Sequence, residues 1–122
     1  EQVGAMYIDL NGLKKVNDQQ GHRAGDDLIM RAAQAIAAVF PEDAYRVGGD
    51  EFVVLQLDVS EAEFEQKTQL LRQKMQEKQV NASIGTIWRR EEDELEELLK
   101  KADERMYREK KQYHSTEADA YA

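Results

Sequence analysis

The sequence predicts an α+β domain, in which helices pack on one face of a mostly antiparallel sheet. Three observations lead to this prediction. Apolar patterning gives the element order β-α-α-β-β-α-β-α. Two of the strands are joined by an internal hairpin, so the sheet cannot be wholly parallel. The length of 122 residues, with 41% hydrophobic and 34% charged residues, suits one soluble domain with a single core.

The expected elements are, in order, a strand at 3–9, helices at 11–20 and 24–40, a hairpin at 44–57, a helix that starts at Ser60, a strand at 80–88 and a helix at about 92–112. The first strand is an apolar run that ends on Asp9, and Gly21 closes the first helix. The second helix places apolar residues on one face, and Pro41 ends it. The residues of that face are Leu28, Ala32, Ile36 and Val39.

The hairpin is predicted from two apolar runs, 44–47 and 52–57, on either side of Gly48-Gly49-Asp50-Glu51. We expect the glycines to supply backbone angles that other residues avoid, and to let the main chain approach a ligand closely.

Local signals also support the elements after the hairpin. Ser60 and Glu63 form a capping box at the start of a helix. Small residues mark the strand at 80–88, and pairs of Glu and Lys four residues apart support the last helix. We expect residues 1–114 to form the domain and residues 115–122 to form a frayed tail.

Composition excludes several classes of protein. The net charge of −8 argues against a nucleic-acid binder, and the absence of cysteine excludes disulfides and thiolate metal sites. No apolar run is long enough to span a bilayer. The chain begins directly before a strand, so we expect an excised domain whose parent protein carries an upstream sensory or regulatory segment. We expect the domain to be cytoplasmic, and membrane anchoring of the parent protein stays open.

Three acids are the candidate metal ligands. If the first strand pairs with the hairpin, the carboxylates of Asp9, Asp50 and Glu51 converge, and such a group holds Mg²⁺ while leaving positions open for substrate phosphates. Two ions about 4 Å apart would activate a hydroxyl and stabilise a leaving pyrophosphate. The alternative is that Asp9 caps the next helix and the other two acids form a solvated turn.

Two further segments are candidates for nucleotide binding. The strand-to-helix turn at 10–14 has free N–H groups that suit phosphate oxygens, although an ordinary turn explains it as well. The polar joint between the first two helices contains Asn17, Asp18 and Asp26, and an Asn and an Asp that face one pocket carry the hydrogen-bonding groups that read a guanine edge. The alternative, which the residues alone favour, is that Asp26 caps a helix and that Asn17 and Asp18 form a turn.

Taken together, these segments resemble the GGDEF domain of bacterial diguanylate cyclases from Asp9 to Lys110. The matching motifs are Asp9–Asp18, Gly21–Asp26, Arg46–Phe52, Ser83–Gly85 and Ala102–Lys110. The resemblance implies a palm-like fold, related to that of nucleotidyl cyclases. It also implies an enzyme that converts two GTP molecules into cyclic di-GMP and two pyrophosphates. It implies Mg²⁺ or Mn²⁺, two ions per active site, and a head-to-tail homodimer with the site divided across its interface.

The resemblance also implies roles for single residues. Asp9, Asp50, Glu51 and the carbonyl of Leu10 match metal ligands, and Glu51 matches the acid that assists deprotonation of the 3′-hydroxyl. The residues that match GTP-binding positions are Gly12, Leu13, Gly49 and Lys110 around the phosphates, and Asn17 and Asp26 at the guanine.

The sequence departs from the family at several positions. An inhibitory product site of the Arg-x-x-Asp type has no counterpart, because the matching stretch 39–42 is Val-Phe-Pro-Glu. His114 stands where the family has an arginine that contacts phosphate, and Asn11 stands where an aspartate is common. A catalytically weak or inactive module that binds GTP or regulates a partner is therefore the alternative function.

Overall fold

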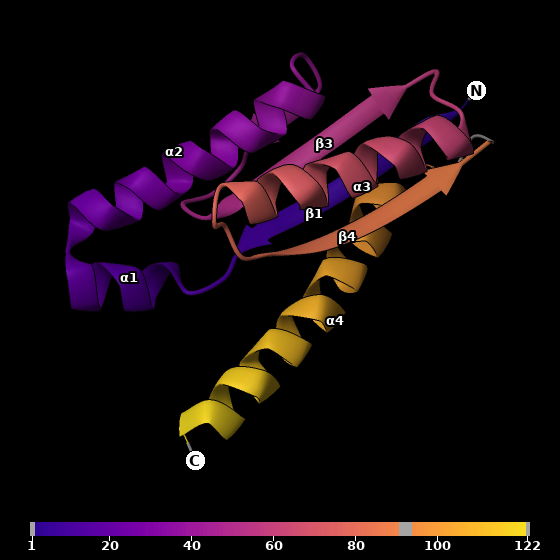
Figure 1. Ribbon diagram of the computed structural model, residues 1–122. Coiled ribbons are helices and arrows are strands. Elements are labelled where there is room, and N and C mark those ends of the chain that lie inside the picture. Colours follow the sequence, from indigo (N-terminus) through magenta and orange to yellow (C-terminus); the bar gives the residue numbers. More distant parts are fainter. Residues whose placement is uncertain (1, 91–93, 122) are drawn as a thin grey trace.

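The computed structural model describes residues 2–90 and 94–121 (Figure 1). Its elements are β1 (Val3–Leu10), α1 (Leu13–Gln20), α2 (His22–Val39), β2 (Ala44–Arg46), β3 (Glu51–Leu57), α3 (Glu61–Glu77), β4 (Ala82–Arg89) and α4 (Leu95–Tyr121). The predicted element order and the α+β fold class are confirmed. The strands form one antiparallel sheet with the order β2-β3-β1-β4.

The first strand lies at the centre of this sheet. β1 pairs with β3 on one side and with β4 on the other, so segments distant in sequence meet along its length. Its last residues, Asp9 and Leu10, lie at the same end of the sheet as the turn between β2 and β3. The candidate site is built at this end of the sheet.

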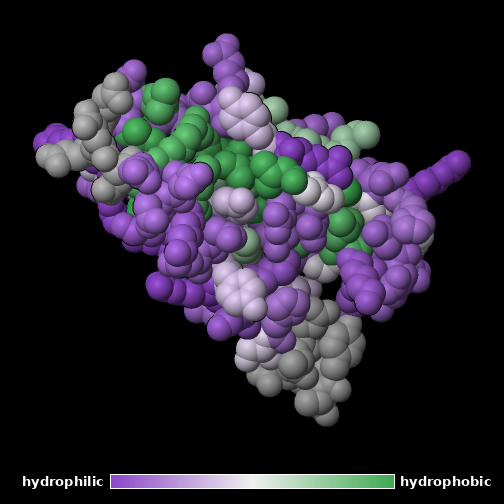
Figure 2. Space-filling view, turned by 180° about the vertical axis from the view of Figure 1, so that it is seen from behind, coloured by the Kyte–Doolittle hydropathy of each residue, from purple (hydrophilic) through white to green (hydrophobic). Residues whose placement is uncertain are grey.

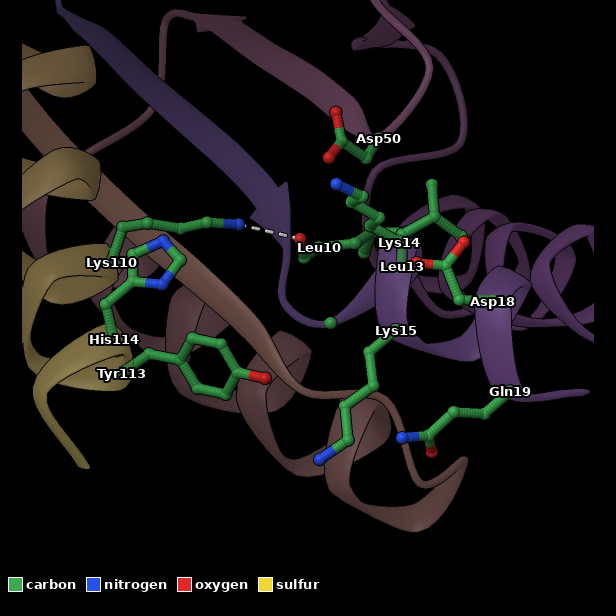
Figure 3. A pocket seen from close by; sticks show the side chains of 11 residues that line it. Leu10, Leu13, Lys14, Lys15, Asp18, Gln19, Asp50, Lys110, Tyr113 and His114 are labelled. Carbon is green, nitrogen blue, oxygen red and sulfur yellow. Dashed lines mark hydrogen bonds between the residues drawn. The ribbon is translucent and has the colours of Figure 1, made fainter. Parts of the chain in front are cut away.

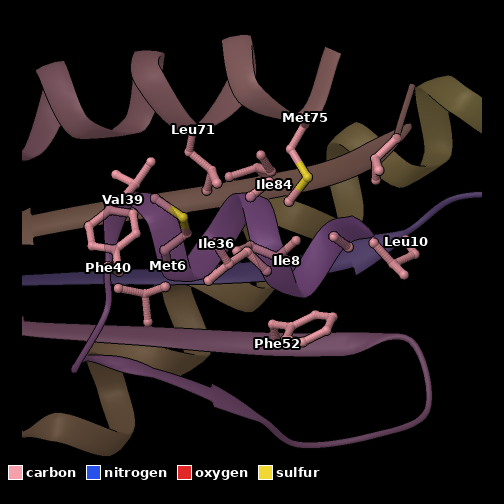
Figure 4. Close-up of a cluster of buried hydrophobic side chains, with 14 of the residues drawn as sticks. Met6, Ile8, Leu10, Ile36, Val39, Phe40, Phe52, Leu71, Met75 and Ile84 are labelled. Carbon is pink, nitrogen blue, oxygen red and sulfur yellow. The ribbon is translucent and has the colours of Figure 1, made fainter. Parts of the chain in front are cut away.

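The helices cover both faces of the sheet, so the prediction that they pack on one face was wrong. Figure 1 shows α3 in front of the sheet and α4 behind it. Met6, Ile8 and Leu10 point from β1 into the larger core beneath α2 and α3 (Figure 4). Ala5 points the other way, into a smaller core with Leu98 and Ala102 of α4 and Ile87 of β4. The alternation of side chains along a strand produces this division.

Helix α4 lies very close to β4 at Gly85. A Cβ atom built on Gly85 would lie 2.1 Å from the carbonyl oxygen of Ala102 and 2.1 Å from the backbone nitrogen of Met106. Only a residue without a side chain fits between the strand and this helix. Gly85 therefore sets how closely α4 approaches the sheet.

Side chains cap the outer edge of β4. The backbone N–H of Ile84 donates to the carboxylate of Glu109, and the Ile84 carbonyl accepts from Arg72 at 3.4 Å. Arg72 also donates to Glu109 at 3.0 Å, and Arg105 donates to the Thr86 carbonyl at 2.6 Å. Residues of α3 and α4 thus satisfy backbone groups that an edge strand leaves unpaired.

The face that carries α4 is only partly covered. Leu55 packs at the margin of the smaller core, while Leu57, two residues along the same strand face, is 62% exposed. Figure 2 shows apolar side chains gathered on this side of the molecule. In the part of the chain that the structure describes, no helix is both long and apolar enough to cross a bilayer.

The ends of the predicted elements shift by a few residues, with one larger difference. The last helix continues to Tyr121, whereas the sequence predicts an end near Gln112. Its predicted start near Glu92 lies outside the described residues. No glycine or proline follows residue 112, so the chain contains no residue that stops the helix there.

Candidate functional site

Strand pairing brings the three candidate acids together. Asp9 lies directly opposite Glu51 in the antiparallel ladder, and the Leu10 N–H donates to the Asp50 carbonyl at 2.9 Å. One carboxylate oxygen from each of Asp9, Asp50 and Glu51 lies within 4.8 Å of the others. The expected convergence of these side chains is therefore present. Asp9 does not cap the next helix, because α1 starts after Gly12 without a side-chain cap.

Lys110 reaches this group from α4. Its ammonium Nζ lies 3.1 Å from Oδ2 of Asp9 and donates to the Leu10 carbonyl at 2.8 Å. The side chains of Lys110 and Asp9 are each 13% exposed. The other carboxylate oxygen of Asp9 is buried and has no hydrogen-bond partner among the described residues.

Burial and neighbouring negative charges raise the pKa of two carboxyl groups of the site, Asp9 and Glu51. Burial raises the pKa of Asp9, although the hydrogen bond and the charge of Lys110 oppose this rise. Burial also raises the pKa of Glu51, and the negative charges of Asp9 and Asp50 raise it further. A nearby cation would relieve both the desolvation and the repulsion.

The donor set fits a hard divalent cation. Three carboxylates and a main-chain carbonyl offer only oxygen, which Mg²⁺ prefers. The buried oxygen of Asp9 that lacks a partner is a free ligand position in this group. The described residues around the acids therefore suit Mg²⁺ or Mn²⁺.

A pocket of about 510 Å³ opens beside the acids (Figure 3). Its walls come from the end of β1 and the following turn, from α1, from the hairpin and from α4. The lining residues are Leu10, Gly12, Leu13, Lys14, Lys15, Asp18, Gln19, Asp50, Lys110, Tyr113 and His114. In Figure 3, Lys110 and His114 enter from α4 and Lys15 from α1. Lysine side chains near a group of carboxylates suit a ligand that combines phosphate and a metal ion.

The floor of this pocket is the start of α1. Gly12 precedes the helix with φ of 77°, in the left-handed region that favours glycine. A Cβ at this position would also lie 3.0 Å from the hydroxyl of Tyr113. The first turn of α1 contains no acid, so its free N–H groups face the pocket without a competing carboxylate.

The glycines of the hairpin do not have the expected backbone angles. Among the described residues, the glycines with positive φ are Gly12 and Gly21, so the prediction of unusual angles for Gly48 and Gly49 was wrong. A Cβ at Gly49 would meet nothing within 4 Å. The space beside Gly49 is open, which is compatible with close approach of a ligand.

The two candidate guanine-reading residues lie near the joint between α1 and α2, outside the lining of the pocket. Asn17 packs so tightly on Gly25 that a Cβ there would lie 1.7 Å from its Oδ1. Asp26 follows Gly25 and is exposed. The alternative of a turn at Asn17 and Asp18 and a cap at Asp26 was wrong, because all three lie inside helices.

Other residues that support the site were not identified from the sequence. Asn11 is 7% exposed, donates to Asn81 at 2.8 Å and accepts from the Ser83 hydroxyl at 3.0 Å. This network fixes the turn after β1 to the start of β4. Asn81 belongs to none of the motifs, and only the strand pairing reveals its partner.

Comparison with known proteins gives consistent matches. A family model described as "Diguanylate cyclase, GGDEF domain" matches residues 1–116. The probable diguanylate cyclase DgcJ of Escherichia coli K12 is 33% identical over 108 residues, which cover 84% of this chain and 22% of that protein. This chain therefore spans less than a quarter of the length of DgcJ.

Two solved structures share the fold. The active GGEEF domain of a diguanylate cyclase from Vibrio cholerae gives a TM-score of 0.79 at 21% identity, covering 92% of this chain and 78% of that one. The GGDEF domain of TpbB, or YfiN, from Pseudomonas aeruginosa gives a TM-score of 0.77 at 30% identity, again covering 92% and 78%.

Proposed function

The chain belongs to the GGDEF family and is homologous to diguanylate cyclases, and from this premise we propose that it condenses two GTP molecules into cyclic di-GMP and two pyrophosphates. The observation that carries the proposal is the convergence of Asp9, Asp50 and Glu51 beside a pocket with lysines on opposite walls. A fold alone would not support an activity, because one fold hosts many functions.

The acids and one carbonyl are the proposed metal ligands. Asp9, Asp50, Glu51 and the main-chain oxygen of Leu10 would hold Mg²⁺ or Mn²⁺, with two ions when the site is complete. When bound, these ions neutralise phosphate charge and lower the pKa of a coordinated hydroxyl. Burial and the negative charges of Asp9 and Asp50 raise the pKa of Glu51, and a bound cation would offset this rise.

The pocket is the proposed place of the triphosphate. The backbone N–H groups of Gly12 and Leu13 lie at the start of α1, where helix geometry favours an anion. Gly49 leaves room at the hairpin, and Lys110 supplies a positive charge from α4. Asn17 and Asp26 would read the guanine at the joint between the two helices.

In the proposed reaction, the 3′-hydroxyl oxygen of one GTP forms a bond to the α-phosphorus of the other. The bond from that phosphorus to the bridging oxygen breaks, and pyrophosphate leaves with the electron pair. Glu51 would accept the proton of the hydroxyl. The same step on the second GTP closes the ring. Because each chain offers one GTP site, a two-fold dimer is needed to bring both nucleotides into line.

A module that binds GTP without turnover is the second candidate. Tyr113 and His114 line the pocket at positions where the family has Gly and Arg. Replacement of that arginine removes one permanent positive charge from the phosphate site, which favours weaker catalysis.

The experiment fuses the chain to a dimerising coiled coil and incubates it with GTP and Mg²⁺. We expect cyclic di-GMP, and we expect no product from the Asp50→Asn variant. Asp58→Asn is the matched control, because Asp58 lies at the opposite end of β3. GTP binding without product at every protein concentration would support the non-catalytic module instead.

A further inference from the structure

The position of Lys110 carries an inference that rests on the proposed function. We propose that Lys110 makes the site specific for the metal and the triphosphate bound together, because its ammonium contacts two of the proposed metal ligands, Asp9 and Leu10. The lysine would oppose binding of the metal alone and favour binding of the metal together with the triphosphate.

The contacts involve the same oxygen atoms that a metal needs. Nζ of Lys110 lies 3.1 Å from Oδ2 of Asp9 and 2.8 Å from the carbonyl oxygen of Leu10. Figure 3 shows the lysine extended from α4 toward Leu10. An ammonium and a divalent cation compete for these oxygens, because both are attracted by the same negative charge.

The helix that carries Lys110 is fixed in place. Its neighbour Glu109 accepts from the Ile84 N–H of β4 and from Arg72 of α3. Gly85 lets the same helix lie directly on β4. The ammonium of Lys110 therefore separates from Asp9 and Leu10 by rotation of its own side chain, and α4 does not need to move.

A metal that binds alone must displace this ammonium. The displaced charge would lose its partners in a region where the lysine is only 13% exposed. Phosphate oxygens in the neighbouring pocket would give the ammonium new partners. Binding of the triphosphate thus lowers the cost of binding the metal, and by linkage the metal improves binding of the triphosphate by the same factor.

The test measures metal and nucleotide binding by the Lys110→Met variant of the full chain. Mn²⁺ is titrated without nucleotide, and free Mn²⁺ is followed by electron paramagnetic resonance. We expect Mn²⁺ to bind on the order of tenfold more tightly than to the unmodified chain, the scale of one charge-assisted hydrogen bond. We expect GTP in the presence of Mn²⁺ to bind more weakly. A merely structural role for Lys110 would weaken both.

Two further variants sharpen the test. Lys111→Met removes the same charge from the next position of α4, outside the pocket lining, where the ammonium lies 5.2 Å from the centroid of the Tyr107 ring, and we expect it to change the affinity for Mn²⁺ alone by no more than about twofold at moderate salt. Lys110→Gln replaces Lys110→Met if circular dichroism shows that the methionine variant is unfolded.

The outcomes separate this inference from the proposed function. An unchanged or lower Mn²⁺ affinity in the folded Lys110 variant would overturn the role of Lys110, even if the unmodified chain makes cyclic di-GMP. Absence of GTP binding by the unmodified chain would overturn the proposed function, while tighter Mn²⁺ binding by the variant would still support competition for Asp9.

Discussion

Replacement of Gly85 by alanine tests how the last helix is seated on the sheet. The new Cβ would lie 2.1 Å from backbone atoms of Ala102 and Met106. Ordinary van der Waals contact starts at 3.4 Å, so α4 must move away by about 1.3 Å (3.4 Å minus 2.1 Å). Backbone atoms of a helix cannot rotate aside as a flexible side chain can.

This displacement has an expected magnitude. A shift of 0.5–1 Å already removes roughly a quarter to a half of the dispersion energy between packed atoms. Leu98, Ala102 and Met106 are at most 3% exposed and are packed on this side of the sheet. We expect the free energy of unfolding to fall by about 3 kcal/mol, at the upper end for an overpacked core. For a domain of this size, that is a fall of roughly 10 °C in Tm.

The assay is urea and thermal denaturation followed by circular dichroism. Gly49→Ala is the matched control, because its Cβ meets nothing within 4 Å, and we expect its free energy of unfolding to change by less than about 0.5 kcal/mol. A Gly85→Ala variant as stable as this control would refute the seating of α4 on Gly85. The displaced helix also carries Lys110, so we expect weaker GTP binding in the same variant.

Further expectations concern single positions. Burial and neighbouring carboxylates raise the pKa of Glu51 above its ordinary value of 4.5, so the native state holds this proton more tightly than the unfolded chain does. The free energy of unfolding of the metal-free protein therefore falls as the pH rises above 4.5. Glu51→Gln should therefore raise Tm in EDTA at pH 8, with a gain that shrinks toward pH 4; an equal gain at both values would contradict this cause. Gly25→Ala pushes the Asn17 side chain aside, so it should weaken binding of GTP more than binding of ATP in calorimetry, and equal losses would count against guanine recognition here. Ser60→Ala removes the cap of α3 and should cost about 1 kcal/mol in urea denaturation, whereas an unchanged midpoint would mean that the cap does not stabilise the helix. Excess cyclic di-GMP should not bind at residues 39–42, and a crystal soaked with it that shows the dinucleotide there would refute this expectation.

The sequence was sufficient for the element order and for the strand ends that carry the acids, because both follow from local pattern, whereas the pairing of the first strand with the hairpin was an assumption. Asp9 closes an apolar run, and Asp50 and Glu51 follow two glycines between two apolar runs. Once β1 pairs with β3, the position of these acids at one edge follows from the register.

The distribution of helices over the two faces of the sheet did not follow from pattern. Ala5 and Gly85 are small, and small residues give no clear sign of which helix covers them. The contacts of Lys110 were equally hidden, because Asp9 lies 101 residues away in sequence and a lysine near a helix end is usually explained by the helix dipole.

The hydrogen bond between the amide side chains of Asn11 and Asn81 could not be predicted from the sequence either. Asn11 and Asn81 are 70 residues apart, and each by itself is typical of a turn. Only the pairing of β1 with β4 places them together.

The capped border of β4 has a consequence for assembly. Backbone groups of β4 that could bond to an added strand are already hydrogen-bonded to the side chains of Arg72, Glu109 and Arg105. The strand at the opposite edge of the sheet, β2, is only three residues long. Neither side of the sheet thus offers a long template on which copies of the domain could stack into a continuous ribbon.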